Sequence, residues 1–442
     1  MRKLTFDENL RMFYKLIKNH KSVMDFPYQS IETIREYQLT QIRRVIKNAY
    51  EHVLFYKRRF ERLHIYPDDI KSFEDFEKLP SISKIDLFGH EEEFIDDRLK
   101  NKPLIVSKTS GSSGRFVDIY CDSEMFITEE LQVLRMIKEL EPHYNALSRE
   151  VLVYTSEYPV SSILGFYKVY YVNNLKSVEY IFEFILNKKP TVLAIYPSIL
   201  WEIAKNIKYE FKKLKLKLII TNSEQSSQSE RNFFSSLFGC TVIDEYSSEE
   251  LQSIAYQCSE MNYHEVSDCT YIELLKSDSD CLVELGEVGE ITGTCFLNQA
   301  MPLIRYRQGD LAKRLPGKCA CNKHTPIIGN PEGRKNSSFI TNDGTIIPSG
   351  RLLDWTYSLV LRYNLPIDSF QIIQKTISDV HILLKLNIIN SETFSTDFVK
   401  TDFINTFGQI FKIYVNIVDE IYKTKSGKYN PIISYVNQDG ND

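Results

Sequence analysis

Short apolar runs that alternate with helix-length stretches constrain the fold of this chain most strongly. Such runs recur from residue 103 onward, at Leu104–Val106, Val151–Tyr154, Thr191–Ile195, Leu218–Ile220 and Thr241–Ile243. Strands separated by helix-length segments are typical of an α/β layer with mixed or largely parallel sheets. Further on, the predicted strands lie closer together, at Tyr271–Leu275, Glu290–Thr294 and Leu303–Arg305. This spacing favours antiparallel pairing and a barrel-like subdomain over about residues 258–325.

The length of 442 residues exceeds one ordinary domain, because about 150 residues per domain predicts about three folding units. The first hundred residues carry apolar positions three and four apart, as amphipathic helices do. Turn-forming residues then gather in Gly329–Ser338. We therefore predict an α/β N-terminal body over residues 1–332 and a small, mobile α+β C-terminal lid domain over residues 333–442.

The composition excludes several classes of protein. Apolar residues make up 43% and charged residues 26% of the chain, which excludes global disorder. The 54 basic and 59 acidic residues leave a net charge of −5, too balanced for a general nucleic-acid surface. No apolar stretch approaches the roughly 20 residues of a membrane helix, and the charged N-terminus lacks the features of a signal peptide. We expect a cytoplasmic protein with small-molecule or protein partners, and leave a homodimer open.

A loop rich in serine, threonine and glycine is the most informative motif. It follows the apolar run Leu104–Val106 and consists of Thr109, Ser110, Gly111, Ser112, Ser113 and Gly114. Glycine lets backbone amides approach an anion closely, and each hydroxyl adds a donor, so phosphate is the natural ligand. The Lys-Ser/Thr ending of a Walker loop is absent. The alternative is a surface loop without a ligand.

Several more motifs follow this loop in a fixed order. They are Thr221-Asn222-Ser223-Glu224, Asp244-Glu245-Tyr246-Ser247-Ser248-Glu249-Glu250, Arg305-Tyr306-Arg307-Gln308-Gly309-Asp310, Gly333-Arg334 and Lys425-Ser426-Gly427-Lys428. In this order the chain resembles the adenylate-forming (ANL) superfamily, and more narrowly its phenylacetate-CoA ligase branch with the capsular-polysaccharide-associated relatives. The resemblance covers nearly the whole chain, and it implies a large N-terminal domain, a small C-terminal domain and the use of ATP.

The resemblance also implies roles for single residues. The loop Thr109–Gly114 would hold the ATP phosphates, with Ser223 and Glu224 as further nucleotide contacts, Tyr246 stacking on adenine and Asp244 beside it. Glu250 would bind Mg²⁺, because hard carboxylate oxygens suit that ion. Asp310 would accept hydrogen bonds from the ribose, Arg334 would reach the nucleotide, and Lys428 would offset negative charge as the carboxylate attacks. Taken singly, each residue has a plainer explanation: Asp310 as a turn cap, Glu250 as a solvated acid, Tyr246 as packing and Lys428 as part of a basic terminal segment.

Three of the eight cysteines and one histidine have the spacing of a metal site. Cys258 and His264 are followed much later by Cys319 and Cys321, and three thiolates with one imidazole would close a tetrahedral structural zinc site. His324 is a competing ligand. The phenylacetate-CoA ligase branch has a similar zinc site, so the resemblance supports this assignment. The ordinary alternative is a chance Cys-x-Cys pair.

The acyl pocket is expected beside the end of the apolar run at Tyr154 and the segment Tyr196-Pro197, which resembles the Tyr-Pro-Ser of the family. Aromatic side chains suit an aryl or otherwise flat acid, although they also suit an ordinary core. Four positions depart from the family pattern: Arg115-Phe116 lacks the usual proline, Ser247 replaces a glycine, the hinge after Arg334 lacks its aspartates, and the second cysteine lacks the glycine that usually follows it. These departures bear most on the step after adenylation, in which the acyl group is transferred from the adenylate to its acceptor.

The expected activity is therefore an AMP-forming acid–thiol ligase that depends on ATP and Mg²⁺. A carboxylic acid would attack ATP to form an acyl-adenylate and pyrophosphate, and a thiol, coenzyme A by resemblance, would then displace AMP. Alternative acceptors are a carrier-protein thiol or an amine in surface-polysaccharide or secondary metabolism. A catalytically silent nucleotide-binding protein is the alternative from another class.

Overall fold

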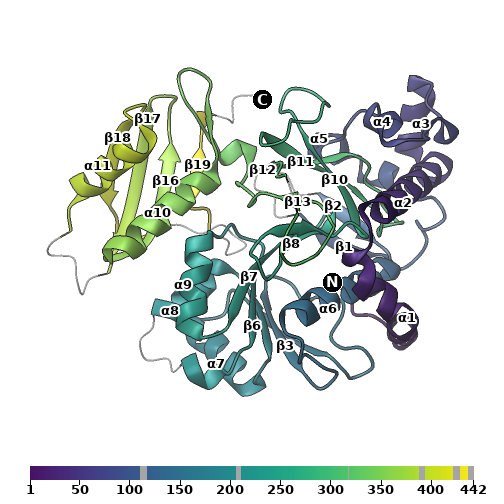
Figure 1. Ribbon diagram of the computed structural model, residues 1–442, viewed down its shortest axis with the longest axis horizontal. Coiled ribbons are helices and arrows are strands. Elements are labelled where there is room, and N and C mark those ends of the chain that lie inside the picture. The colour runs from purple at the N-terminus through teal and green to yellow at the C-terminus, as the bar shows by residue number, and fades with distance from the viewer. Residues whose placement is uncertain (110–116, 206–210, 317, 388–393, 422–428, 437–442) are drawn as a thin grey trace. The chain divides into compact units, whose positions relative to one another are not determined.

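The computed structural model describes residues 1–109, 117–205, 211–316, 318–387, 394–421 and 429–436 (Figure 1). The chain divides into two compact units. The first consists of Met1–Ser223, Leu237–Gln308 and Ala312–Asn330, and the second of Glu224–Ser236, Gly309–Leu311 and Pro331–Asp442. The main break thus lies between Asn330 and Pro331, and two short segments from the middle of the chain join the second unit.

Helices form the first hundred residues. They are α1 (Phe6–Asp25), α2 (Ile31–His52), α3 (Leu54–Leu63), α4 (Phe73–Glu77) and α5 (Lys84–Leu87). Hydroxyl side chains start four of them, because Thr5, Ser30, Ser72 and Ser83 each accept a hydrogen bond from a backbone amide of the first turn. Buried apolar residues such as Ile42, Ile46 and Ala49 then fix the inner face of α2.

An eight-stranded sheet is the centre of the first unit, in the order β13-β9-β8-β7-β6-β5-β3-β4. Its strands are β3 (Arg149–Tyr154), β4 (Lys168–Asn173), β5 (Val192–Ile195), β6 (Leu218–Thr221), β7 (Thr241–Ser248), β8 (Gln252–Gln257), β9 (Tyr263–Glu265) and β13 (Ile327–Ile328). Pairing is parallel from β4 to β7 and antiparallel from β7 to β13. Strands β5 and β6 are buried throughout, as expected for parallel strands covered on both faces.

Helices cover both faces of the parallel part. In Figure 1, α7 (Val178–Lys188) and α8 (Pro197–Lys205) lie on one side of it, and α6 (Ser123–Leu140), backed by α1, lies on the other. The mixed α/β body expected from the sequence is therefore confirmed. Among the described residues, no helix has both the length and the apolar character needed to cross a bilayer.

Two smaller sheets complete the first unit. Strands β1 (Ile105–Lys108) and β2 (Asp118–Cys121) form an antiparallel pair. The run Leu104–Val106 was expected in the parallel layer, and this expectation is wrong: β1 pairs with β2 across the Ser/Thr/Gly loop. Strands β10 (Thr270–Leu275), β11 (Val288–Cys295) and β12 (Tyr306–Lys313) form a three-stranded sheet, while β8, β9 and β13 from the same region extend the large sheet.

The expected strand Leu303–Arg305 is also wrong, because β12 starts one residue after it. Arg305 has φ of 51°, in the left-handed region, which a strand residue does not adopt. Its side chain is fully buried and forms an ion pair of 2.8 Å with Glu273 on β10. Burying this guanidinium against a carboxylate thus explains why the backbone turns here instead of continuing the strand.

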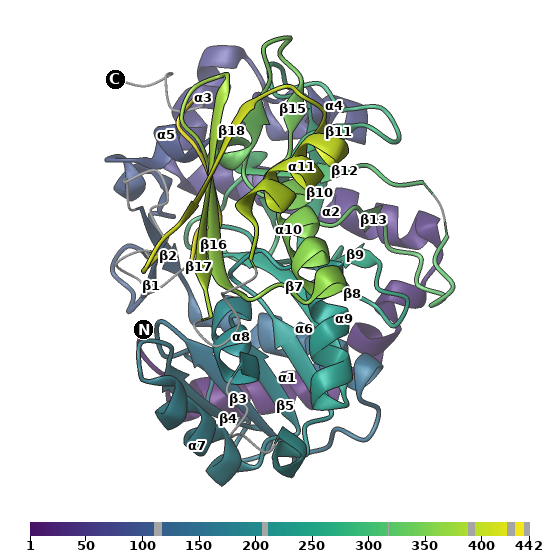
Figure 2. The same ribbon diagram turned by 90° about the vertical axis from the view of Figure 1, so that its left-hand side faces the viewer.

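The second unit contains a four-stranded sheet in the order β18-β17-β16-β19, with antiparallel and parallel pairs. Its strands are β16 (Ile367–Gln374), β17 (Asp379–Leu386), β18 (Lys412–Ile417) and β19 (Ile432–Ser434), and its longer helices are α10 (Ser349–Tyr363) and α11 (Thr396–Phe407). Both helices lie on one side of this sheet (Figure 2). Edge-to-face contacts of Trp355 with Phe403 and Phe407 join α10 to α11.

Candidate active site

The parallel strands of the first unit end beside one another, and candidate residues stand at each end. Tyr154 is the last residue of β3, Tyr196 directly follows β5, Ser223 lies two residues after β6, and Tyr246 lies near the end of β7. Strand β3 pairs with β4 on one side and with β5 on the other. The order in which the chain adds strands to the sheet therefore reverses at β3. In open α/β sheets, ligands bind outside the carboxyl ends of the strands at such a switch point.

Two tyrosines line the switch point between β3 and β5. The rings of Tyr154 and Tyr196 meet edge to face with centroids 5.4 Å apart, and the Tyr196 hydroxyl lies 2.9 Å from the Thr155 hydroxyl. Pro197, the first residue of α8, fixes the start of that helix behind Tyr196. Burial raises the pKa of Tyr154 well above its usual value, so this hydroxyl remains a neutral donor.

The turn after β7 carries two adjacent carboxylates that point to different partners. The Glu249 carboxylate accepts hydrogen bonds from the Ser107 hydroxyl on β1 and, over 3.3 Å, from the Tyr154 hydroxyl. The Glu250 carboxylate instead accepts a 3.1 Å bond from the Tyr306 hydroxyl on β12. Glu249 thus joins Tyr154 to β1, the strand that leads into the Ser/Thr/Gly loop.

Sequence reasoning missed Glu249, because two neighbouring glutamates look equivalent in a linear motif. The β7–β8 pairing shifts register between Tyr246 and Ser247, shortly before the turn that carries both carboxylates. Tyr246 itself is half-buried against the core of the first unit. Ser247, at which the register shifts, is also the position where the resemblance to the ligases led us to expect glycine.

Thr109 is buried at the base of the Ser/Thr/Gly loop. Its backbone amide donates to the Val117 carbonyl over 3.1 Å, and its hydroxyl oxygen accepts from the Val117 amide over 3.1 Å. These two bonds extend the β1–β2 ladder and hold the two ends of the loop together. The other loop candidates, Ser110, Gly111, Ser112, Ser113 and Gly114, lie outside the described residues.

Asp244 is buried, and both of its carboxylate oxygens accept bonds from the protein. The Thr221 hydroxyl donates over 2.7 Å and the Tyr263 hydroxyl over 2.8 Å. Its backbone amide donates to the Gln257 side chain over 3.0 Å. Asp244 therefore ties β6, β7 and β9 together at the edge where the candidate residues meet, and the structure gives it a positioning role in the sheet.

Two further buried acids belong to the first unit, and sequence reasoning missed them too. Glu129 on α6 accepts a 2.5 Å bond from the Tyr158 hydroxyl, and burial raises its pKa to about 7. Burial likewise raises the pKa of Glu245 on β7 to about 8. No sequence pattern distinguishes Glu129 from the other acids of an amphipathic helix, because only its position in the fold removes it from water.

Four candidates belong to the second unit. The Asp310 carboxylate lies 3.6 Å from the Arg334 guanidinium, and their backbones form an isolated antiparallel bridge. The Glu224 carboxylate accepts a 3.1 Å bond from the backbone amide of Tyr429. Lys428 lies outside the described residues, but the residue that follows it is anchored in this way.

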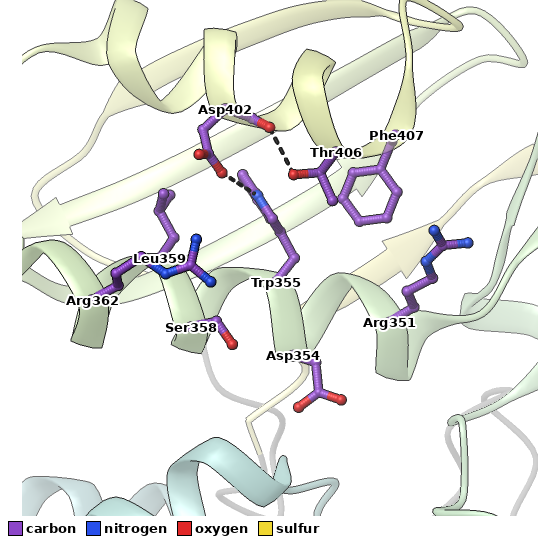
Figure 3. Close-up of a pocket in the computed structure, with 9 residues that line it drawn as sticks. All are labelled: Arg351, Asp354, Trp355, Ser358, Leu359, Arg362, Asp402, Thr406 and Phe407. Carbon is purple, nitrogen blue, oxygen red and sulfur yellow. Dashed lines mark hydrogen bonds between the residues drawn. The ribbon is translucent and has the colours of Figure 1, made fainter.

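A pocket of about 300 Å³ also lies in the second unit, between α10 and α11 (Figure 3). Arg351 and Arg362 stand at its two ends, and the Trp355 indole donates a 2.8 Å bond to the Asp402 carboxylate. Its lining contains none of the predicted site residues, so it adds nothing to the chemistry described above.

The four predicted metal ligands converge at one edge of the large sheet. The ligand atoms of Cys258, His264, Cys319 and Cys321 all lie within 4.8 Å of one another. The Cys258 and Cys319 sulfurs are 3.6 Å apart, close to the roughly 3.7 Å expected around a tetrahedral zinc with bonds of about 2.3 Å. The Cys321 sulfur lies 3.3 Å from His264 Nε2.

The protonation of His264 also fits a metal ligand. Its Nδ1 lies 3.1 Å from the Thr325 carbonyl oxygen, which can only accept, so Nδ1 carries the proton and Nε2 offers its lone pair. Burial and the nearby Lys323 charge lower the pKa of this imidazole to about 4, which keeps it neutral. The competing ligand His324 is exposed and lies 2.7 Å from the Gln29 carbonyl, outside the cluster.

Comparison with known proteins identifies relatives of this chain by sequence and by structure. Residues 339–435 match the family described as CapK C-terminal domain. Curated relatives include the phenylacetate-coenzyme A ligases of Pseudomonas putida, 24% identical over 348 residues, and of Escherichia coli K12, 23% identical over 349 residues. Each alignment covers 72% of this chain and 75% of the relative.

Solved structures of 2-hydroxyisobutyryl-CoA ligase resemble the chain over most of its length. One, in the postadenylation state with an acyl-AMP ligand, has a TM-score of 0.78 at 16% identity and covers 92% of this chain and 90% of that one. Another, with 2-HIB-AMP and CoA in the thioesterification state, has a TM-score of 0.61 at 16% identity, with the same coverage of both chains.

The fold is therefore that of the adenylate-forming ligases. Within this class, the similarity to phenylacetate-CoA ligases and the CapK-type C-terminal domain confirm the narrower resemblance that the ordered motifs indicated.

Proposed function

We propose that the chain is an AMP-forming ligase that activates a carboxylic acid with ATP and Mg²⁺ and then transfers the acyl group to the thiol of coenzyme A. The observation that carries the proposal is the meeting of Tyr154, Tyr196 and Glu249 at the β3/β5 switch point, joined through Ser107 to the strand before the Ser/Thr/Gly loop. The CoA ligases among the relatives and neighbours support the thiol acceptor.

In this reaction the acid lies beside Tyr154 and Tyr196, with its carboxylate directed toward the loop Thr109–Gly114. Backbone amides and hydroxyls of the loop hold the ATP phosphates, and a carboxylate after β7 supplies an oxygen ligand for Mg²⁺. Lys428 offsets the negative charge that builds up at the α-phosphate, while Asp310 and Arg334 hold the ribose and nucleotide. The experiment that tests the proposal is pyrophosphate exchange into ATP, measured with and without added acids.

We further propose that Cys258, His264, Cys319 and Cys321 bind one structural zinc ion. Four soft donors leave no open coordination position, so the ion would act as a brace and take no part in the chemistry. Cys258 directly follows β8, His264 lies in β9, and the Cys319/Cys321 segment precedes β13, which pairs with β9. The ion would therefore hold the antiparallel edge of the large sheet together.

Replacing Glu249 or Glu250 by glutamine is expected to change different kinetic properties of the exchange reaction. Glu249→Gln weakens the acceptor for Tyr154 and Ser107, so the apparent KM for the acid is expected to rise about tenfold, with an unchanged Mg²⁺ requirement. Glu250→Gln is expected to raise the Mg²⁺ concentration at half-maximal exchange about tenfold, because a neutral amide is a poorer Mg²⁺ ligand. Titrations of acid and Mg²⁺ in the exchange assay measure both effects. If the Mg²⁺ requirement follows Glu249 instead, the metal role assigned to Glu250 is wrong.

A further inference from the structure

The first helix presents an apolar stripe to the outside of the first unit. Phe6, Leu10, Tyr14 and Ile17 are 73%, 48%, 62% and 66% exposed. Spacings of four, four and three residues place these side chains on one face of α1. Single exposed apolar residues are ordinary, but four in one row along a helix indicate a contact surface.

The opposite face of α1 is fixed to the body of the unit, so the stripe cannot turn inward. Met12 is fully buried, and both Arg11 and Lys15 form 2.5 Å ion pairs with Glu124 at the start of α6. Thr5 and Glu8 form a capping box at the first turn. In Figure 1, α1 lies at the outer side of α6.

Charged residues along the stripe are arranged so that the helix complements itself in one orientation. Asp7 lies in the first turn, and Lys18 and Lys21 lie in the last two turns, all three exposed. An antiparallel copy of α1 places Asp7 opposite Lys18 and Lys21, whereas a parallel copy places like charges together. Opposite charges beside an apolar seam set partner choice and orientation in paired helices.

We propose that α1 is a homodimer interface, in which two copies of the helix pair antiparallel about a two-fold axis between Leu10 and Tyr14. Phe6 of one copy packs near Ile17 of the partner subunit, and Asp7 pairs with Lys18 of the partner subunit. A helix of 20 residues is about 30 Å long, which is small for an interface, so the dimer is expected to be concentration-dependent. This inference does not depend on the proposed ligase activity.

Analytical ultracentrifugation of the full chain at several concentrations tests the pairing with charge reversals. Asp7→Lys alone, and Lys18→Glu with Lys21→Glu, are each expected to raise the dimer Kd at least tenfold. The triple variant that combines all three is expected to return to within about threefold of the natural protein, because its charges are complementary again. Arg43→Glu, a reversal at an exposed position of α2, is the matched control and leaves the Kd unchanged.

Three results would overturn the proposal. The first is a natural protein that remains a monomer at every concentration. The second is a triple variant that fails to regain the dimer lost in the partial reversals, and the third is a dimer that persists in Leu10→Arg. Flotation with vesicles of phosphatidylcholine and phosphatidylglycerol tests whether the stripe binds a membrane instead of a second copy of the chain. If the natural protein is monomeric and its vesicle binding is abolished by Leu10→Arg, the stripe is a membrane-binding surface and the proposed dimer is wrong. Circular dichroism of each variant verifies that α1 remains folded.

Discussion

Lys428→Ala is expected to lower acid-dependent pyrophosphate exchange by about 10²–10³-fold and to change ATP affinity by less than about threefold. A positive group that stabilises charge mainly in the transition state affects the rate much more than ground-state binding, and one such donor is typically worth about this factor. The adjacent Tyr429 donates its backbone amide to Glu224 and accepts at its hydroxyl from the Phe370 amide over 3.0 Å, which holds the end of this segment.

The same segment offers matched controls for this prediction. Lys423 and Lys425 carry the same charge within five residues of Lys428. Alanine at either position removes one positive charge from the segment but no group assigned to the reaction, so exchange is expected to stay within about threefold. Equal losses in all three variants would mean that the basic segment acts only as a diffuse charge, and the specific role of Lys428 would be wrong.

Cys319→Ser combined with Cys321→Ser is expected to remove about one zinc ion per chain and to lower the unfolding temperature by about 5–8 °C. Structural zinc sites contribute folding free energy directly, and removing two thiolates leaves Cys258 and His264 unable to close the site. A loss of about 3–5 kcal/mol corresponds to a shift of roughly this size in a domain of this length. Metal analysis and calorimetry of the purified protein measure the two quantities.

Cys281→Ser is the matched control for zinc, because Cys281 is exposed and lies outside the Cys/His cluster. This variant is expected to keep its metal and its unfolding temperature within about 2 °C. A natural protein that is folded and contains no zinc after purification without chelators would contradict the assignment. So would a double serine variant that keeps the ion.

The alternation of strands and helices could be predicted from the sequence because apolar periodicity determines which faces are buried. The strand prediction failed at two places where contacts with distant residues accompany a different backbone conformation or pairing. Arg305 turns away from the strand because its guanidinium is buried against Glu273, and β1 leaves the parallel layer because its neighbour across the loop is β2. Such long-range partners are not visible in a local window of sequence.

The roles that the ordered motifs assign to single residues stay predictions, whereas the four predicted metal ligands do lie together, although they come from segments about 60 residues apart in the chain. The sequence could not distinguish Glu249 from Glu250, since their partners, Tyr154 and Ser107 for Glu249 and Tyr306 for Glu250, come from distant strands. Nor could it predict that Asp244 is fully engaged by Thr221 and Tyr263, because both donors come from other strands.

The central claim is that the chain forms acyl-adenylates, and acid-dependent pyrophosphate exchange tests it most directly. The assay supplies ATP, Mg²⁺, labelled pyrophosphate and a panel of aryl, hydroxy, amino and aliphatic carboxylic acids, without coenzyme A. The account predicts that at least one acid raises exchange well above the acid-free rate, and that Lys428→Ala abolishes most of that increase. A protein that binds ATP but shows no acid-dependent exchange across the panel would contradict the account and favour a silent nucleotide-binding protein.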